Sequence, residues 1–466
     1  MAQGEVKYIP FSELNALVCN KLSDTKLYTG STFSYLKVME HALTYAALGN
    51  DKKLIRNRLH WPVIVQNMHA SLKRLLKPSP RVEIALKPIV ILDPVRLTQG
   101  ADGEYHSIYI DKWLSVIPAQ VRTIVQKKRD KRIYADYVLT DFSRNHGAFD
   151  ATEQDLLIEL KDILQKVRSS KVFTAYELQH IASTMYIFWE DFRFYYRWLK
   201  HGKVEKILFI CHYHNEGLLA ACKLLAIESV ELQHGLIARN DLYYVYDKQF
   251  SSVVRKAMFP DILMVYGDYW RNVVLEGVEF LPSQVQVAGD YLYRLPKATT
   301  EEVPKENVVL VCAQKMMHSE YLAYFELLHQ YQMAFPEWKV IVKMHPLEPR
   351  KDLYQKVKTY GFELIDMERN LDDLLRIAKI QISIYSTTFF DAVGFNVVNF
   401  SLQEYGNYSD YAADIVKEAV AFPIAITENP IAKYMLAKDQ LIPMERSEIY
   451  ADFEMDKMKA LLHITE

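Results

Sequence analysis

The sequence predicts an α/β fold in which two Rossmann-like domains face each other across a cleft, with a largely helical extension at the N-terminus. Two observations carry this prediction. From residue 203 onward, short apolar runs rich in β-branched residues alternate with helical patterns, as in parallel sheets covered by helices. A stretch with two prolines and several charges, 291–307, separates two such series and is typical of an interdomain linker. We therefore expect one domain at 1–296 and a second at 297–466.

The first 200 residues carry fewer signals. Apolar residues recur at helical spacing over 33–48 and 61–76, and no chemistry is evident there. An aromatic-rich helix is expected over 185–199, where core packing is the ordinary explanation and contact with a membrane or a substrate is the alternative. Strands are expected over 82–86, 89–92 and 105–110.

Composition excludes several classes of protein. A chain of 466 residues is too long for one core, and a net charge of −2 argues against a dedicated nucleic-acid binder. The four cysteines show neither pairing nor metal spacing, which favours a reducing compartment, the cytoplasm. No apolar run is long enough to span a membrane and the first residues are no signal peptide, so we expect at most peripheral contact with the inner face of the membrane. Classical dinucleotide and P-loop motifs are missing from the sequence.

Residues 127–132 form a basic cluster, Lys-Lys-Arg-Asp-Lys-Arg. A solvated helix end is the ordinary explanation for such a run. The alternative is contact with an acidic lipid or with a phosphate-bearing substrate. Together with the aromatic helix, this cluster is where peripheral contact with a membrane would be expected.

The strand predicted at 339–343 ends in polar residues. Lys343 and His345 are two residues apart, so they share a face where the strand runs out, and Pro346 stops the strand. Ligands of open α/β sheets bind at the carboxyl ends of strands. A cation and an imidazole at this position are suited to bind a phosphate, although a histidine beside a proline is often only structural.

A second strand, 380–384, ends in a run of hydroxyl side chains. Ser386, Thr387 and Thr388 stand where a helix should begin, so one of them is expected to cap it. The free N–H groups of a helix start also bind phosphate, and the two roles are compatible. Asp391, one turn further on, is expected to be a hydrogen-bonding partner.

The first domain offers a candidate for proton transfer at 233–235. Gln233, His234 and Gly235 follow an apolar strand, and the glycine permits a tight turn or the close approach of a ligand. A histidine is suited to take a proton from an alcohol, so we predict His234 as a general base, with Gln233 and Gly235 as contacts. A purely structural histidine is the alternative.

A neighbouring strand end carries further candidates. His212, His214 and Glu216 follow the strand 206–211, and any of them could replace His234 as the base or orient a substrate. Their spacing matches no known set of metal ligands, so no metal site is expected. In the second domain, the loop after the strand 308–312 places Gln314, Lys315 and His318 as further phosphate contacts.

Over about 205–405, this arrangement resembles bacterial surface-polysaccharide transferases of the GT-B fold. The motifs Lys343-Met344-His345-Pro346 and Ser386-Thr387-Thr388 are similar to those of capsule and teichoic-acid polymer transferases, and of GT-B sialyltransferases with His-Pro and Ser-Ser/Thr motifs. The resemblance implies that His345, Ser386 and Thr387 bind the phosphate of a nucleotide donor. It implies a base at Gln233-His234-Gly235, as in the glycerophosphotransferases, where the sialyltransferases use an acidic motif instead.

The resemblance thus implies an inverting glycosyltransferase that moves a sugar, or an alcohol phosphate, from a nucleotide-activated donor to a growing surface glycan. The acceptor would be a glycan or a lipid-linked glycan, with 1–296 on the acceptor side and 297–466 binding the donor. No metal or other cofactor is expected besides the nucleotide-sugar co-substrate, and no nucleic-acid partner. The alternatives are a nucleotide-sugar epimerase of GT-B fold and a non-catalytic protein of glycan assembly. The nucleotide base, the transferred group and the acceptor stay open.

Overall fold

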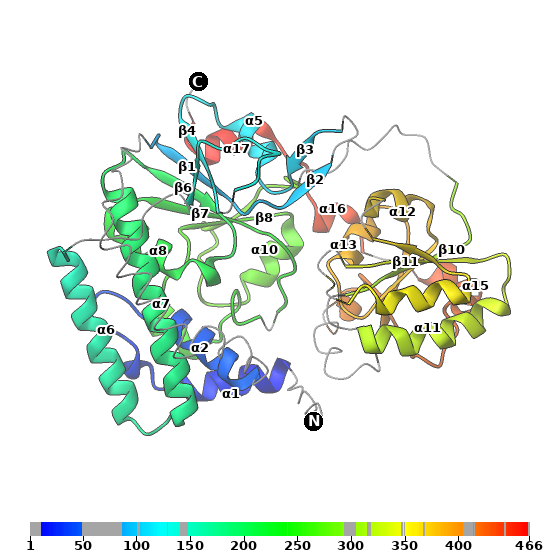
Figure 1. Cartoon of the computed structure of the whole chain (residues 1–466), viewed down its shortest axis with the longest axis horizontal. Helices are drawn as coiled ribbons and strands as arrows, with labels where there is room; N and C mark the ends of the chain where they lie inside the picture. Colours follow the sequence, from blue (N-terminus) through cyan, green and yellow to red (C-terminus); the bar gives the residue numbers. More distant parts are fainter. Residues whose placement is uncertain are drawn as a thin grey trace. The chain divides into compact units, whose positions relative to one another are not determined.

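The chain folds into two compact units, each with its own parallel sheet and flanking helices (Figure 1). The first unit contains residues 13–296 and 451–466, and the second contains residues 297–450. The structure is a computed structural model. It describes residues 11–48, 86–99, 103–127, 129–139, 148–239, 241–254, 256–292, 304–314, 318–345, 348, 350–366, 369–403, 413, 415–441 and 444–464.

The sheet of the first unit has seven parallel strands in the order β5-β4-β1-β6-β7-β8-β9. The chain builds outward from β1 in one direction and then continues from β6 in the other, so the strand order reverses between β1 and β6. The strands are β1 Ile89–Asp93, β4 Arg122–Gln126, β5 Tyr137–Val138, β6 Lys206–Phe209, β7 Glu228–Leu232, β8 Ile262–Val265 and β9 Val285–Val287. A separate antiparallel pair joins β2 Leu97–Gln99 to β3 Tyr105–Ser107.

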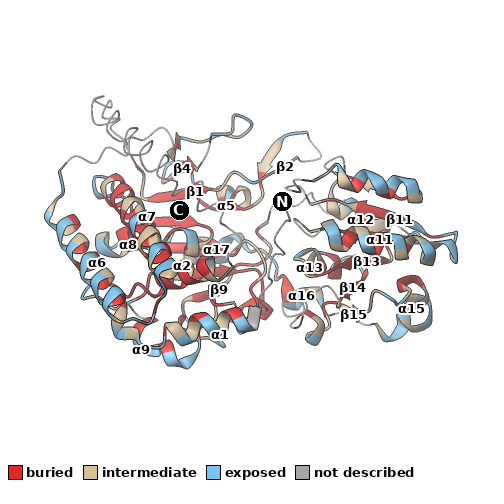
Figure 2. Cartoon of the chain, turned by 60° about the horizontal axis from the view of Figure 1, so that its bottom comes forward, coloured by how far each residue is buried: buried red, intermediate tan, exposed pale blue. Residues whose placement is uncertain are grey.

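Two long helices, α6 Ala151–Ser169 and α7 Ala175–Lys200, lie side by side and begin with capping boxes (Figure 1). In α7, Thr174 and Glu177 satisfy each other's backbone N–H groups at the helix start. Most of the aromatic side chains over 185–199 are buried and pack on neighbouring helices (Figure 2), so core packing explains this helix. The other helices of the unit are α1 Phe11–Lys21, η1 Thr25–Leu27, α2 Leu36–Leu48, α5 Asp111–Val116, η3 His212–His214, α8 Glu216–Leu225, η4 Lys248–Phe250, α9 Ser251–Val254, α10 Asp268–Val274 and α17 Met455–Leu461.

Helix α8 packs very closely against α7 at Gly217. A Cβ atom at this glycine would lie 2.5 Å from the backbone nitrogen of Phe192 and 2.8 Å from the carbonyl carbon of Asp191. Because both obstacles are backbone atoms, Gly217→Ala should force the two helices apart and destabilise the protein by about 1–3 kcal/mol. Urea unfolding measures this change. Leu224→Ala, on the exposed face of the same helix, is the control and should change little; equal midpoints for both variants would contradict the close packing.

The second unit repeats the same plan with six parallel strands in the order β12-β11-β10-β13-β14-β15, and its order reverses between β10 and β13. Its strands are β10 Val308–Cys312, β11 Lys339–Lys343, β12 Glu363–Ile365, β13 Ile380–Ser383, β14 Val398–Leu402 and β15 Phe422–Ile424. Its helices are α11 His318–Met333, η5 Leu353–Tyr360, α12 Leu371–Ile377, α13 Thr388–Val393, α15 Pro430–Ala437, η7 Lys438–Gln440 and α16 Arg446–Ile449.

The central strand β10 shows why these apolar runs form a sheet. Val309 and Val311 point into the core on one face of the sheet, whereas Val308, Leu310 and Cys312 point into a second core on the other face. Every position is buried, because helices cover both faces of a parallel sheet.

Some local predictions differ from the structure. The strand expected over 105–110 ends at Ser107, because Asp111 begins α5 and its carboxylate accepts the N–H of Ser107. The basic cluster 127–132 is not a helix end but lies in the loop between β4 and β5. Most of the strand expected over 82–86, and the helix expected over 61–76, lie outside the described residues.

The C-terminal segment returns to the first unit, although the sequence places it in the domain 297–466. The N–H of Ala451 donates to Tyr266 O at 2.9 Å, and the ring of Phe453 meets that of Trp113 at 5.5 Å. Helix α17 packs on α5. Among the residues that the structure describes, no helix is long and apolar enough to cross a membrane.

Candidate functional site

Two residues of the first unit with a left-handed backbone lie where its strand order reverses. Two residues beyond β1, Val95 has φ +61°, and two residues beyond β6, Cys211 has φ +60°. A residue with a side chain rarely adopts this left-handed conformation, least of all a β-branched one such as Val95, and such strain is often found at functional sites. Open α/β sheets bind ligands at this point, outside the carboxyl ends of the strands.

His234 lies at this same edge, two residues after β7. Its Nε2 is 2.9 Å from the hydroxyl of Tyr213, and either group can donate according to the tautomer of the ring. The backbone oxygen of His234 accepts from the Tyr109 hydroxyl at 2.9 Å, so the residue is held from two sides. Its buried Nδ1 finds no hydrogen-bond partner among the described residues.

The surroundings keep His234 neutral. Burial is the main reason why its pKa falls to about 4, and the cationic Arg96 adds to the effect, while Glu231 opposes it. Arg96 itself is exposed and donates to the Tyr109 hydroxyl at 3.0 Å. A neutral imidazole at physiological pH can accept a proton, which is the chemistry predicted for this residue.

The two neighbours of His234 shape the turn. Gln233 is fully buried; its amide donates to Gly235 O at 2.8 Å and accepts the N–H of Tyr266 at 3.0 Å. Its own carbonyl accepts from the hydroxyls of Tyr266 and Tyr291, both at 2.7 Å. The side chain of Gln233 is thus used within the fold, and its predicted contact with a substrate stays a prediction.

His212 is hydrogen-bonded within the core of the first unit. It is fully buried, with Nδ1 2.6 Å from Glu231 Oε2 and Nε2 2.7 Å from the carbonyl oxygen of Tyr243. Both ring nitrogens are therefore in hydrogen-bond contact with groups of the fold. Burial raises the pKa of Glu231, but His212 and the Tyr244 hydroxyl outweigh it, so the net direction is down. Neither ring nitrogen is available to a substrate.

Glu231 was not predicted as a site residue, because it lies within an otherwise apolar strand. A carboxylate inside a fully buried strand always needs a charged or hydrogen-bonding partner. That rule could have paired Glu231 with a histidine at the neighbouring strand end.

Helix α2 brings a further histidine to the turn after β6. His41 Nδ1 lies 3.4 Å from Glu216 Oε1, and its ring lies 5.4 Å from that of His214. Both His41 and Glu216 are only partly exposed, and Glu216 begins α8. His41, which belongs to the N-terminal helical part where no chemistry was expected, therefore lies in contact with Glu216, one of the predicted candidates.

In the second unit, Gln314 lies at the point of strand reversal. Its Oε1 accepts the N–H of Tyr385 at 2.9 Å and lies 3.3 Å from the Ser383 hydroxyl, which itself donates to Cys312 O at 2.8 Å. The loop after β10 is thus hydrogen-bonded to the end of β13. Lys315 lies outside the described residues, as does Pro346.

The hydroxyl run after β13 forms a small network. Ser386 Oγ accepts from the backbone N–H of Thr388 at 3.2 Å and from its hydroxyl at 2.9 Å, and Gln381 donates to Thr388 Oγ1 at 2.6 Å. Thr387 occupies the N-cap position of α13 without a side-chain capping bond. As expected, Asp391 acts as a hydrogen-bonding partner, accepting from the Tyr450 hydroxyl at 3.1 Å.

Lys343 and His345 lie on the same carboxyl edge as Ser386, on strands separated only by β10. The amine of Lys343 donates to the backbone oxygen of Asp366, so its side chain lies toward β12. The backbone oxygen of His345 accepts the N–H of Glu348 at 3.0 Å, and its side chain is half-buried. Adjacent strands lie about 4.8 Å apart, which puts the His345 and Ser386 strand ends about 10 Å apart.

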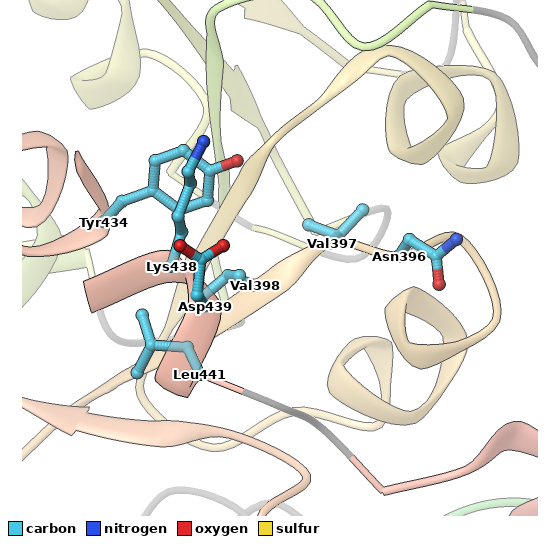
Figure 3. Close-up of a pocket in the computed structure, with 7 residues that line it drawn as sticks. All are labelled: Asn396, Val397, Val398, Tyr434, Lys438, Asp439 and Leu441. Atoms are coloured by element: carbon cyan, nitrogen blue, oxygen red, sulfur yellow. The ribbon is translucent and has the colours of Figure 1, made fainter. Parts of the chain in front are cut away.

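The cavity in Figure 3, about 360 Å³, lies elsewhere in the second unit. It opens at the amino end of β14, where Val398 begins the strand, away from the carboxyl ends that carry Ser386 and His345. The ring of Tyr434 and the charged ends of Lys438 and Asp439 line it, so it is separate from the predicted phosphate site. No group of three His, Cys, Asp or Glu residues suited to a metal occurs among the described residues.

No protein-family model matches the chain, and no curated protein matches its sequence. Solved structures do resemble it. The S. aureus MnaA–UDP co-structure has 12% sequence identity and a TM-score of 0.50, over 82% of this chain and 98% of that one. UDP-GlcNAc 2-epimerase from Neisseria meningitidis, bound to UDP-GlcNAc, has 12% identity and a TM-score of 0.47, over 80% and 99%. The calicheamicin glycosyltransferase CalG4 has 12% identity and a TM-score of 0.45, over 82% and 100%.

The likeness to the S. aureus structure extends over both units. Together with the two parallel sheets and their flanking helices, it confirms the predicted fold, two Rossmann-like domains of the GT-B type. At 12% identity it shows the fold alone.

Proposed function

We propose that this protein is a glycosyltransferase of GT-B fold that moves a sugar, or an alcohol phosphate, from a nucleotide-activated donor to a glycan acceptor. The observation that carries the proposal is His234, a neutral imidazole at the carboxyl edge of the first sheet, held by Tyr213 and beside a strained turn. His234 removes a proton from the acceptor hydroxyl while that hydroxyl attacks the donor. The fold is that of a protein solved with UDP, which supports a nucleotide donor.

The second unit is proposed to bind the phosphate of the donor. Lys343, His345, Ser386 and Thr387, with Thr388, offer a cation, an imidazole and hydroxyls at one edge of the sheet. These groups stabilise the negative charge that develops on the leaving nucleotide. Gln314, bonded to the backbone at Tyr385, shapes the loop beside them. By resemblance, the acceptor is a growing surface glycan, and no metal is required.

A nucleotide-sugar epimerase is the second candidate. It needs acid–base groups acting on the sugar itself, and the pair of His41 with Glu216, 3.4 Å apart, is the observation that favours it. Incubating candidate donors with and without glycan acceptors separates the two reactions. For a transferase, we expect the donor to be consumed only when the acceptor is present, and the product to be a glycan one unit longer than the acceptor. An epimer formed from donor alone would assign the second function, and an unchanged donor in every mixture would point to a non-catalytic protein.

His345→Ala and Ser386→Ala should both weaken nucleotide binding without unfolding the protein. Each removes a hydrogen bond to a charged phosphate, which costs about 1.5–3 kcal/mol, or roughly 10- to 150-fold in affinity. Titration calorimetry measures the loss, and the melting temperature reports on the fold. Thr359→Ala, on the exposed side of the same unit, is the control. Wild-type affinity in both variants would remove these residues from the site.

A further inference from the structure

Arg96 is a cation beside the candidate base of the first unit. It follows the left-handed residue Val95, just beyond the carboxyl end of β1. Its guanidinium donates to the Tyr109 hydroxyl at 3.0 Å, and that hydroxyl donates to the backbone oxygen of His234 at 2.9 Å. The ends of β1 and β7 are two strand spacings apart in the order β1-β6-β7, about 10 Å. Tyr109 bridges this distance, so Arg96 and His234 belong to one site.

The fold fixes the backbone that carries Arg96. The carboxylate oxygen Oδ1 of Asp93 accepts the N–H of Val95 at 2.8 Å and the hydroxyl of Ser107 at 2.9 Å. The backbone oxygen of Arg96 accepts the N–H of Ile108 at 2.9 Å. These bonds hold the left-handed turn from both sides. Arg96 is therefore positioned by the fold before any ligand binds.

The charge of Arg96 is available to a ligand. Its side chain is exposed, and its partner, the Tyr109 hydroxyl, is neutral. Over the part of the chain that the structure describes, the guanidinium forms no ion pair with a carboxylate. The carboxyl group of Asp93 is fully buried, and burial raises its pKa, which disfavours the charged form.

The chemistry of a guanidinium favours an oxyanion as the ligand. Arg96 has N–H groups that Tyr109 does not use, because a guanidinium carries five of them in a planar fork. This fork matches two oxygens of a phosphate or of a carboxylate through parallel hydrogen bonds. An acceptor that offers its hydroxyl to His234 would bring its neighbouring groups toward Arg96.

We propose that Arg96 binds an anionic group, a phosphate or a carboxylate, on the same unit of the acceptor whose hydroxyl His234 deprotonates. This inference rests on the proposed function, since it names the chemical class of the acceptor for that reaction. The acceptor is then an acidic sugar or a phosphorylated alcohol rather than a neutral glycan. Arg96 determines specificity for this acceptor and takes no part in the proton transfer.

The test measures the binding of glycerol 3-phosphate and of glycerate by calorimetry, with glycerol as the uncharged comparison. Each anion carries its charge and a hydroxyl on one short carbon chain. Saturating UDP is present, so that the predicted donor site is occupied. We expect at least one of the two anions to bind the wild type, and Arg96→Gln to bind it about tenfold more weakly, because the lost bond is charge-assisted but exposed to water. Arg96→Lys keeps the charge without the planar fork and should restore part of the affinity.

The matched control is Arg168→Gln, at an exposed arginine of α6. It should bind both anions as the wild type does, and melting temperatures report whether both Gln variants are folded. Equal affinity of the wild type and of Arg96→Gln for both anions would overturn the inference, and so would glycerol that binds as tightly as the anions. Loss of UDP affinity in Arg96→Gln would assign this arginine to the donor and would also overturn it.

A different result would overturn the proposed function. If every candidate donor stays unchanged in the mixtures with glycan acceptors, the transfer reaction is wrong. A difference in anion binding between the wild type and Arg96→Gln that persists in that case would leave the anion site at Arg96 in place.

Discussion

Replacing His234 by alanine is expected to lower kcat by about 10²–10⁴-fold, the usual contribution of a general base. The affinity for nucleotide should stay nearly unchanged, since the residues proposed to bind its phosphate belong to the second unit. Because the pKa of His234 lies near 4, activity of the wild type should stay level as the pH falls from 7 to 5. Initial rates with donor and acceptor, measured across this pH range, give kcat, the apparent affinity for the nucleotide donor and the pH dependence of activity.

Neighbouring residues supply the controls for this prediction. Tyr213→Phe keeps the ring and removes only the hydroxyl at Nε2, so it should lower kcat less than His234→Ala does. His212→Ala should destabilise the protein, because it leaves the buried carboxylate of Glu231 without the His212 ring as a hydrogen-bonding partner. If His234→Ala keeps normal turnover while Glu216→Ala abolishes it, the base belongs to the turn after β6, and the relation to acidic-motif sialyltransferases becomes the closer one.

Glu279→Gln is expected to stabilise the protein at pH 8 and to leave it unchanged near pH 4.5. Glu279 is 8% exposed, and burial raises its pKa to about 8. Between pH 4.5 and 8 the folded carboxyl holds a proton that the unfolded chain releases, so the contribution of this group to stability declines as the pH rises. Glutamine has no such proton, and its carbonyl can still accept the Tyr246 N–H, now 2.9 Å from Oε2.

The gain at pH 8 should be on the order of 3 kcal/mol, since one pKa unit corresponds to about 1.4 kcal/mol and relaxation reduces the full shift. Denaturant midpoints at pH 5 and pH 8 measure it as a difference between variant and wild type, which cancels the other titrating groups. Glu205→Gln, at an exposed position, is the control and should show no pH-dependent difference. A Glu279→Gln variant with the same pH profile as the wild type would mean that this carboxyl is ionised in the folded protein.

The parallel strands could be predicted because their signal is local. In β10, β11 and β13, a continuous apolar run buried on both faces ends in polar residues, and the observed bounds agree with the predicted runs to within a residue. The same pattern, an apolar run followed by polar residues, correctly placed His234, Gln314 and Ser386 at the carboxyl ends of strands. The repeated order of strands and helices then indicated two doubly wound units, and the structure confirms them.

The features that could not be predicted from the sequence are contacts between residues that are far apart along the chain. His41 contacts Glu216, which is 175 residues away along the chain. The sequence around α2 does not distinguish this histidine from a solvent-exposed one. His212 was an alternative candidate for the base, and its contacts with Glu231 and with the backbone oxygen of Tyr243 show that it is bonded within the core. The return of α17 to the first unit likewise rests on Phe453 meeting Trp113, a contact without any sequence signal.

We propose that the second unit binds a nucleotide through the strand ends that carry His345 and Ser386. Calorimetric titration of the wild-type protein with CMP, CDP, UDP and GDP tests it most directly, with Ser386→Ala measured in parallel. We expect at least one of these nucleotides to bind the wild type, and Ser386→Ala to bind the same nucleotide at least about tenfold more weakly. Binding of none of the four, or equal binding by the wild type and Ser386→Ala, would contradict it.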